Sequence, residues 1–266
     1  MRWEELTSDQ FAQAVMDCER TCVISLGVIE RHGPHLPLGT DMLNGLRLCE
    51  LVARREPVVI FPPWFLGQIY EANCFPGTIA IPPEALLAVT GQILDEIARN
   101  GFTKIIAYVA HGGNAHFANF LTQCQLSEEK PYQLYVYRWS AGFTDAERAA
   151  WSEVQQAPGG GHADEAETSV MLAHRPDLVD MDRADQIGER RGRMDHVKVG
   201  LNGFWWYADY PEHLAGDPRA ASAETGEKLL EIQAGAMTRF VRAVKDDKVT
   251  AELAAEFFQR QRQLRD

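Results

Sequence analysis

The chain has 266 residues, of which 45% are hydrophobic and 24% are charged, and its formal net charge is −12 at pH 7. This acidic balance argues against nucleic acids and anionic membranes as partners, because both are recognised by clustered Lys and Arg. No apolar run reaches the ~20 residues that a membrane-spanning helix requires, and no secretory signal is visible. The five cysteines are scattered along the chain, as is typical of reduced thiols in a cytoplasmic protein. We therefore expect a cytoplasmic protein with one domain over residues 1–266.

Strand-like and helix-like segments alternate along the chain. Short runs rich in β-branched and aromatic residues predict buried strands at 21–29, 58–61, 104–110 and 133–138. Apolar periodicity and end signals predict helices at 41–54, 83–99 and 115–125, from near 164, over 219–244 and in the amphipathic tail. This alternation implies right-handed crossovers. The predicted fold is therefore α/β, a three-layer α/β/α sandwich with a short, mainly parallel sheet.

The first group of chemistry-bearing residues follows the first predicted strand, within Gly27–Asp41. Ligands collect outside the carboxyl ends of strands in open parallel sheets, where Glu30 and His32 are expected to lie. Residues two apart in an extended segment point the same way, so both side chains can face one site. A rigid Gly- and Pro-rich turn would then present Asp41 at a helix start. Two carboxylates and an imidazole suit Zn²⁺ or Mn²⁺ better than Ca²⁺. As alternatives, Asp41 would equally well act as the N-cap of the helix, and His35 would be a hydrogen-bonded loop residue.

A second group, His111-Gly-Gly-Asn114, ends the most hydrophobic predicted strand and faces the same edge of the sheet. This position makes His111 a candidate metal ligand. The two glycines permit close backbone approach, and Asn114 can hold the loop. His116, just inside the next helix, is interpreted as a packing residue.

The third group lies at the start of the helix predicted near residue 164. At about 100° per residue, Glu167 falls within the apolar stripe of that helix, where a carboxylate is costly unless it is paired or bound to metal. Glu167 is therefore a candidate ligand, with a salt bridge to an arginine as the alternative. Glu165 projects roughly 160° away from Glu167 around the helix and is interpreted as exposed to solvent. A weaker alternative is that Glu165 is a catalytic residue that orients His162.

His162 follows a run of three glycines, Gly159–Gly161. Such a flexible entry would let the imidazole reach a substrate, which makes His162 a candidate catalytic residue. A loop position without a role is the alternative.

Together, the three groups resemble the creatininase family of amidohydrolases. The resemblance rests on Gly27–Asp41, His111–Asn114 and His162–Ser169, with support from 216–226, and its motifs follow the family's order over roughly residues 25 to 230. It implies an α/β/α fold, a homo-oligomer (usually a hexamer) and two divalent metal ions. Zn²⁺ is the first choice, with Mn²⁺ or Fe²⁺ as alternatives. By this resemblance, Glu30 and His111 would hold one metal, His32 the other, and Asp41 would bridge them.

Two departures from creatininase proper are informative. There, the histidine matching His111 is followed by Tyr and then a ligand Glu, whereas this chain has two glycines. One ligand is therefore missing, and Glu167 is predicted to replace it. Creatininase also holds creatinine with a Trp-Asp pair ahead of the histidine matching His162, where this chain has Pro158-Gly159. Creatinine is thus not the expected substrate, and the chain resembles the His-Gly-Gly-Asn branch, which includes formamide deformylases and peptide-trimming enzymes.

The resulting hypothesis is a metal-dependent amidohydrolase that cleaves a non-peptide C–N bond, in a cyclic amide or a formamide, of a small-molecule substrate. Two metals about 3.5–4 Å apart would provide hydroxide at neutral pH, and His162 would protonate the leaving nitrogen. Peptide trimming and lactam or lactone opening are alternatives on the same metal site. A non-catalytic subunit with a coordinatively closed metal is the alternative from another class. The aromatic run Phe204–Tyr207, in an aperiodic stretch over 180–214, either lines the pocket for a flat substrate or packs in an interface.

Overall fold

Four parallel strands form the sheet at the centre of the molecule, whose computed structural model describes residues 1–197 and 202–264. In spatial order the strands are β2 (Val59–Ile60), β1 (Thr21–Leu26), β3 (Lys104–Val109) and β4 (Gln133–Arg138). Leu26 pairs with Val109, and Val109 pairs with Arg138. The loops after β1, β3 and β4 therefore leave the sheet at one edge, and the predicted short parallel sheet is confirmed.

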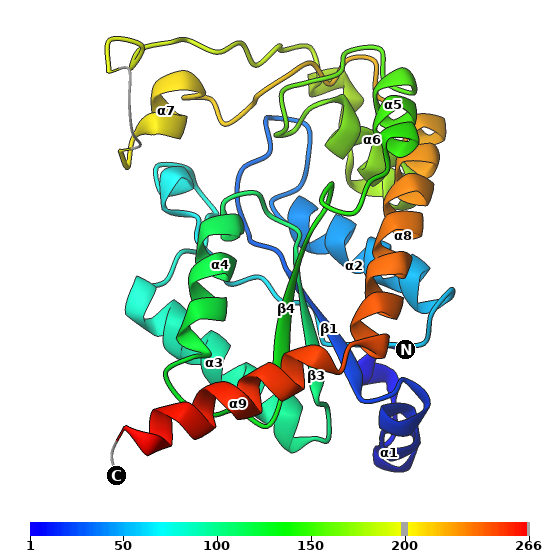
Figure 1. Cartoon of the computed structure of the whole chain (residues 1–266). Coiled ribbons are helices and arrows are strands. Elements are labelled where there is room, and N and C mark those ends of the chain that lie inside the picture. Colours follow the sequence, from blue (N-terminus) through cyan, green and yellow to red (C-terminus); the bar gives the residue numbers. More distant parts are fainter. Residues whose placement is uncertain (198–201, 265–266) are drawn as a thin grey trace.

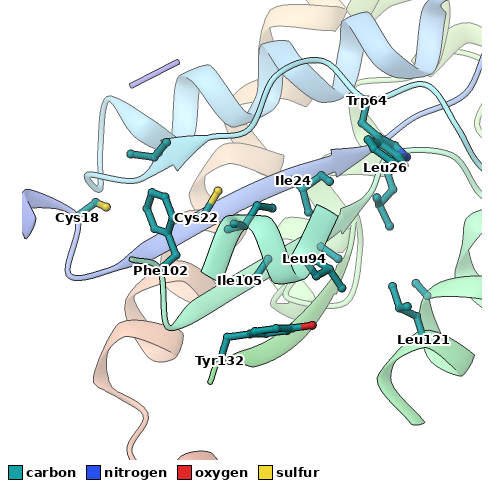
Figure 2. Close-up of a cluster of buried hydrophobic side chains, with 14 of the residues drawn as sticks. Cys18, Cys22, Ile24, Leu26, Trp64, Leu94, Phe102, Ile105, Leu121 and Tyr132 are labelled. Carbon is teal, nitrogen blue, oxygen red and sulfur yellow. The ribbon is translucent and has the colours of Figure 1, made fainter. Parts of the chain in front are cut away.

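One face of the sheet packs against α1 (Ser8–Asp17), α3 (Pro83–Arg99) and α4 (Asn114–Cys124). Figure 2 shows this core, in which Ile24 and Leu26 of β1 lie among Leu94 of α3 and Leu121 of α4. Side chains alternate between the two faces of a strand. Every residue of β1 is buried, so both of its faces are covered.

The opposite face packs against α2 (Thr40–Ala53) and α8 (Ala223–Asp246). Val23 of β1 and Ile106 of β3 belong to this second core, together with Leu48 of α2 and Met237 of α8. Figure 1 shows α3 and α4 on one side of the strands and α2 and α8 on the other. The three-layer sandwich is therefore confirmed.

The pattern of apolar residues did not predict α1 or α5 (Asp145–Glu153). Both begin with a capping box, formed by Thr7 with Gln10 and by Thr144 with Glu147. The amphipathic tail is helical as predicted, in α9 (Val249–Gln263). The stretch over 180–214 is largely irregular where the structure describes it, with one short helix, α7 (Trp205–Asp209). In the part of the chain that the structure describes, four 3₁₀ turns accompany these elements, at Trp3–Glu5, Tyr70–Ala72, Pro176–Leu178 and Met181–Arg183.

Helix α6 (Glu165–His174), which carries the third sequence group, is held against α8 by an unusually close contact. A Cβ atom on Gly226 of α8 would lie 1.9 Å from the carbonyl oxygen of Ser169, so only glycine fits there. Asp164 caps the start of α6, where its Oδ1 accepts a hydrogen bond from the backbone N–H of Glu167 at 3.1 Å. Helix α6 is therefore held at its start by the Asp164 cap and near its middle by α8.

Within residues 1–197 and 202–264, no helix combines the length and the apolar character that a membrane span requires. All five cysteines carry free thiols, and Cys18, Cys22 and Cys49 are buried.

Candidate metal centre

Side chains from four separate segments meet at the carboxyl edge of the sheet. Glu30 and His32 lie in the loop after β1, Asp41 in the first turn of α2, His111 in the loop after β3, and Glu167 in the first turn of α6. The first four are buried, and the Glu167 side chain is 28% exposed. The structure thus brings together all five residues that the sequence marked as metal ligands.

These side chains form two triads that share Asp41. In the first triad, Nδ1 of His111 lies 2.8 Å from Oε1 of Glu30 and 3.1 Å from Oδ2 of Asp41. In the second triad, Nε2 of His32 lies 3.3 Å from Oδ1 of Asp41 and 3.8 Å from Oε2 of Glu167. Within each triad the candidate ligand atoms all lie within 4.8 Å of one another. Each oxygen of Asp41 therefore serves a different triad.

Backbone carbonyl groups orient both histidines. Nε2 of His111 lies 3.1 Å from the carbonyl oxygen of Gln68, and Nδ1 of His32 lies 3.2 Å from that of Glu30. A carbonyl oxygen can only accept, so each of these ring nitrogens donates its proton. In the neutral ring, the other nitrogen then presents a lone pair to the carboxylates, which is the arrangement usual for metal-bound histidine.

The charge balance of the two triads calls for cations. Oε1 of Glu30 and Oδ2 of Asp41 are buried without a hydrogen-bond donor. Burial alone would lower the pKa of His111 and His32, but the carboxylates raise the pKa of His111 well above its usual value and that of His32 to about 10. Unpaired charge is costly in a buried site, so positive charge must come from protons or metal ions. Three carboxylates and two imidazoles fit a pair of divalent cations.

Glu167 lies beside the other candidate ligands, as predicted from its place on the apolar face of the helix. The pKa of Glu167 is raised to about 8, mainly because the carboxyl group is buried. The charge of His32 lowers this pKa and the charge of Asp41 raises it further. Its Oε2 accepts a hydrogen bond from the backbone N–H of Ala163 at 2.6 Å. No arginine of residues 1–197 or 202–264 pairs with Glu167, so the alternative of a salt bridge is wrong.

His162 is buried next to the second triad. Its ring centre lies 4.3 Å from that of His32, and its Nε2 donates a hydrogen bond to the carbonyl oxygen of Arg31 at 2.9 Å. Burial, with the charge of His32, lowers the pKa of His162 to about 3. The ring is therefore neutral, and Nδ1 is the nitrogen left to exchange a proton.

Within the glycine run before His162, Gly160 is closely packed, and His162 itself is paired through its backbone, which differs from the flexible entry that was predicted. The backbone of His162 pairs with Ala215 through hydrogen bonds of 3.3 and 2.9 Å. A Cβ atom on Gly160 would lie 2.2 Å from the carbonyl oxygen of Ala215, and all three glycines have positive φ. The backbone of His162 is thus anchored.

Glu165 is buried, so its predicted solvation is wrong. Its two carboxylate oxygens accept hydrogen bonds from the backbone N–H groups of Gln156 and Ala157, at 3.0 and 2.6 Å. The residue therefore holds the loop before the glycine run, and these bonds do not orient His162. Helical periodicity could not reveal this, because the chain that covers this face comes from outside the helix.

The structure also places Asp41, His35 and His116 in defined surroundings. The N-cap of α2 is Gly39, so Asp41 is not a helix cap. His35 is hydrogen-bonded to Thr168 Oγ1 at 2.8 Å, as expected of a loop histidine. His116 is exposed and borders a cavity beside the triads, so its interpretation as a packing residue is wrong.

His213, which no motif in the sequence indicated, contacts a predicted ligand directly. Its Nδ1 accepts a hydrogen bond from Nε1 of Trp206 at 3.3 Å, so its Nε2 donates to Oε2 of Glu30 at 2.7 Å. This bond engages one oxygen of Glu30 and leaves Oε1 for the first triad. His213 has a φ of +53°, a left-handed conformation in which His is enriched among non-glycine residues.

We expect His213→Asn to weaken metal binding by about 10- to 100-fold, the usual effect of losing a partner that orients a ligand. Asparagine tolerates the left-handed backbone, so the loss would reflect the missing hydrogen bond rather than strain. Calorimetric titration of the metal-free protein with Zn²⁺ or Mn²⁺ measures the effect. Trp206→Phe, which keeps the ring stacking, should have a smaller effect; unchanged affinity in His213→Asn would contradict the proposed positioning.

A cavity of ≈ 570 Å³ opens beside the triads, and Trp205 and Trp206 line it together with His111 and His162. Of the predicted aromatic run, Phe204 is 74% exposed and points away from the protein interior. Residues 198–201, within the stretch 180–214 that was expected to shape a pocket or an interface, lie outside the described residues.

Comparisons with known proteins identify the family of this chain. Residues 4–241 match the family described as Creatininase: Creatinine amidohydrolase. Creatinine amidohydrolase of Pseudomonas putida is 27% identical over 254 residues, covering 86% of this chain and 91% of that protein. Mycofactocin precursor peptide peptidase of Mycobacterium tuberculosis is 31% identical over 222 residues, covering 78% of each. A solved mutant creatininase of type II shares the fold, with a TM-score of 0.79 and 22% identity over 92% of this chain and 99% of that one.

The matched range includes both triads, His162 and His213. Because the family match extends over most of its length, the chain belongs to the creatininase family.

Proposed function

We propose that this protein is a metal-dependent amidohydrolase that cleaves a non-peptide C–N bond, in a cyclic amide or a formamide of small size, with the help of two divalent cations. The observation that carries the proposal is the pair of triads that share Asp41, with ligand atoms of each triad within 4.8 Å. Zn²⁺ is the first choice, with Mn²⁺ or Fe²⁺ as alternatives; solved creatininases of this fold include a manganese form and a zinc–zinc form. A homo-oligomeric, hexameric assembly in the cytoplasm belongs to the same proposal.

When bound, the cations would polarise the amide carbonyl and supply hydroxide at neutral pH. Glu30, Asp41 and His111 would hold one cation, and His32, Asp41 and Glu167 the other. The neutral ring of His162 would accept a proton at Nδ1 during nucleophilic attack and pass it to the leaving nitrogen, because an amide nitrogen leaves poorly unless it is protonated. The bond from Nε2 to the carbonyl oxygen of Arg31 would keep the ring in this orientation.

The second candidate is peptide trimming on the same site. It is favoured by the 31% identity to the mycofactocin precursor peptide peptidase of Mycobacterium tuberculosis. Lactam or lactone opening would use the same residues. A non-catalytic structural centre is disfavoured, because a cavity of ≈ 570 Å³ reaches Glu30, His111 and Glu167, where a closed structural site would be covered by protein.

Metal analysis combined with a hydrolysis screen tests the proposal. We expect about two metal ions per chain and hydrolysis of at least one class of compound among formamides, cyclic imides and short peptides. Chelation should abolish this hydrolysis, and addition of Zn²⁺ or Mn²⁺ should restore it. Activity that survives complete removal of metal would overturn the proposal. The class of substrate that is cleaved separates the first candidate from the second.

A further inference from the structure

Two cavities meet at the triads. The front cavity, of ≈ 570 Å³, is the one bordered by His111, His162 and Trp205. The back cavity, of ≈ 340 Å³, lies between α2, α5 and α6 and is bordered by Trp139, Trp151 and Val170. Asp41, Gly161 and Glu167 line both cavities, so the ligand cluster lies where the two adjoin. A substrate with its scissile bond at the cluster therefore has room on both sides of that bond.

Aromatic and apolar side chains form much of the wall of the back cavity. Trp139 and Trp151 pack with their ring centres 5.1 Å apart, and Tyr108, Ala166 and Val170 also line the cavity. No lysine or arginine of the described chain lines this cavity, so it offers no counter-ion for an anionic group.

The acidic residues at the inner end of the back cavity are already engaged. Asp164 accepts hydrogen bonds from the backbone N–H groups of Gly161 and Glu167, at 2.9 and 3.1 Å. Asp41 and Glu167 belong to the triads. The other polar side chains that line the cavity, Asn44, Ser152, Gln155 and Gln233, carry no charge. The cavity therefore offers apolar and uncharged polar surface, which suits a neutral group of apolar or aromatic character.

The position of His162 assigns the two halves of the amide. Hydrolysis adds water across the C–N bond, and the products are a carboxylic acid and an amine whose nitrogen has gained a proton. His162, the proposed proton donor, borders the front cavity and is absent from the lining of the back cavity. The leaving amine must then lie in the front cavity, and the acyl group must point to the back.

We propose that the back cavity is an acyl subsite, and that the natural substrate is an amide whose acyl group is apolar or aromatic. This inference rests on the proposed function and narrows it, because a formyl group would leave a cavity of ≈ 340 Å³ unfilled. The front cavity, which has Gln68, Glu71 and His116 on its walls beside Trp205 and Trp206, receives the amine half of the substrate.

Hydroxamic acids probe this subsite without requiring turnover, because they chelate the metal and carry the acyl side chain. Binding of formohydroxamic acid and phenylacetohydroxamic acid to the full, Zn²⁺-loaded protein is measured by calorimetry. We expect the phenylacetyl compound to bind about 10- to 100-fold more tightly, as expected for burial of an aromatic ring.

A matched pair of variants locates the effect. Ser152 is exposed and borders the back cavity, whereas its neighbour Glu153 is exposed on the same helix and does not. Ser152→Trp should fill the cavity and remove most of the preference for the phenylacetyl compound, while formohydroxamic acid binds as before. Glu153→Trp should leave both affinities unchanged, and metal content and circular dichroism should match in all three proteins.

The outcomes separate this inference from the proposed function. Equal affinity of the two compounds for the unmodified protein, or a preference that survives Ser152→Trp, overturns the acyl subsite while the metal centre stands. Failure of both compounds to bind the Zn²⁺-loaded protein overturns the metal centre itself. A loss of preference in Glu153→Trp as large as that in Ser152→Trp also counts against the subsite, because it would show that the helix rather than the cavity is responsible.

Discussion

Replacing Asp41 by Ala is expected to abolish binding of both divalent cations. Its Oδ2 lies 3.1 Å from His111 and its Oδ1 lies 3.3 Å from His32, so one carboxylate belongs to both triads. We expect affinity to fall by more than about 100-fold at each site, beyond the 10- to 100-fold typical of losing a residue that only orients a ligand. Metal content after dialysis, measured by plasma mass spectrometry, reports the result. Glu30→Ala should likewise empty its triad.

The matched control for Asp41→Ala is Asp145→Ala. Asp145 also lies in the first turn of a helix, α5, but its side chain is fully exposed. This substitution removes the same carboxylate far from the cluster and should leave the metal content unchanged. If Asp41→Ala retains two cations, the shared triads do not form the metal site.

His162→Ala is expected to lose turnover while it keeps its metal. General acid–base groups typically contribute 10²- to 10⁴-fold, and we expect a fall in kcat of about that size with a small change in KM. Steady-state kinetics on the substrate found in the screen, with metal analysis of the same samples, measures both quantities. His196→Ala, at an exposed position, is the control.

The result that would contradict this role is loss of metal in His162→Ala. Ligand atoms of His162, Glu30 and His32 also lie within 4.8 Å of one another, so a ligand role is the specific alternative. Metal loss would show that His162 is a ligand rather than a proton carrier.

The layers of the fold could be predicted because burial on two faces leaves a clear trace in a sequence. The residues of β1 and β3 are apolar without alternation, and only a strand covered on both sides favours that pattern. α1 and α5 were missed although each starts with a capping box, because their apolar faces are short and cover little buried surface.

The candidate site was predictable where a residue's position on its own element decides its environment. Glu167 stood out because a carboxylate on an apolar helix face needs a partner, and the structure places it 3.8 Å from His32. Glu165 and His213 were misjudged or missed because their partners come from distant segments. The loop at 156–157 covers Glu165, and Glu30 lies 183 residues before His213. Neither contact leaves a periodic pattern in the sequence.

The division of the two Asp41 oxygens between neighbouring triads has a thermodynamic consequence. A cation that fixes the plane of this carboxylate in one triad also sets its orientation for the other, so the two occupancies are linked. Such linkage is reciprocal: whatever factor the first ion imposes on the affinity for the second, the second imposes on the first. A residue that touches one triad, such as His213, therefore influences the cation in the other without contacting it, and a titration curve will not separate into two independent steps.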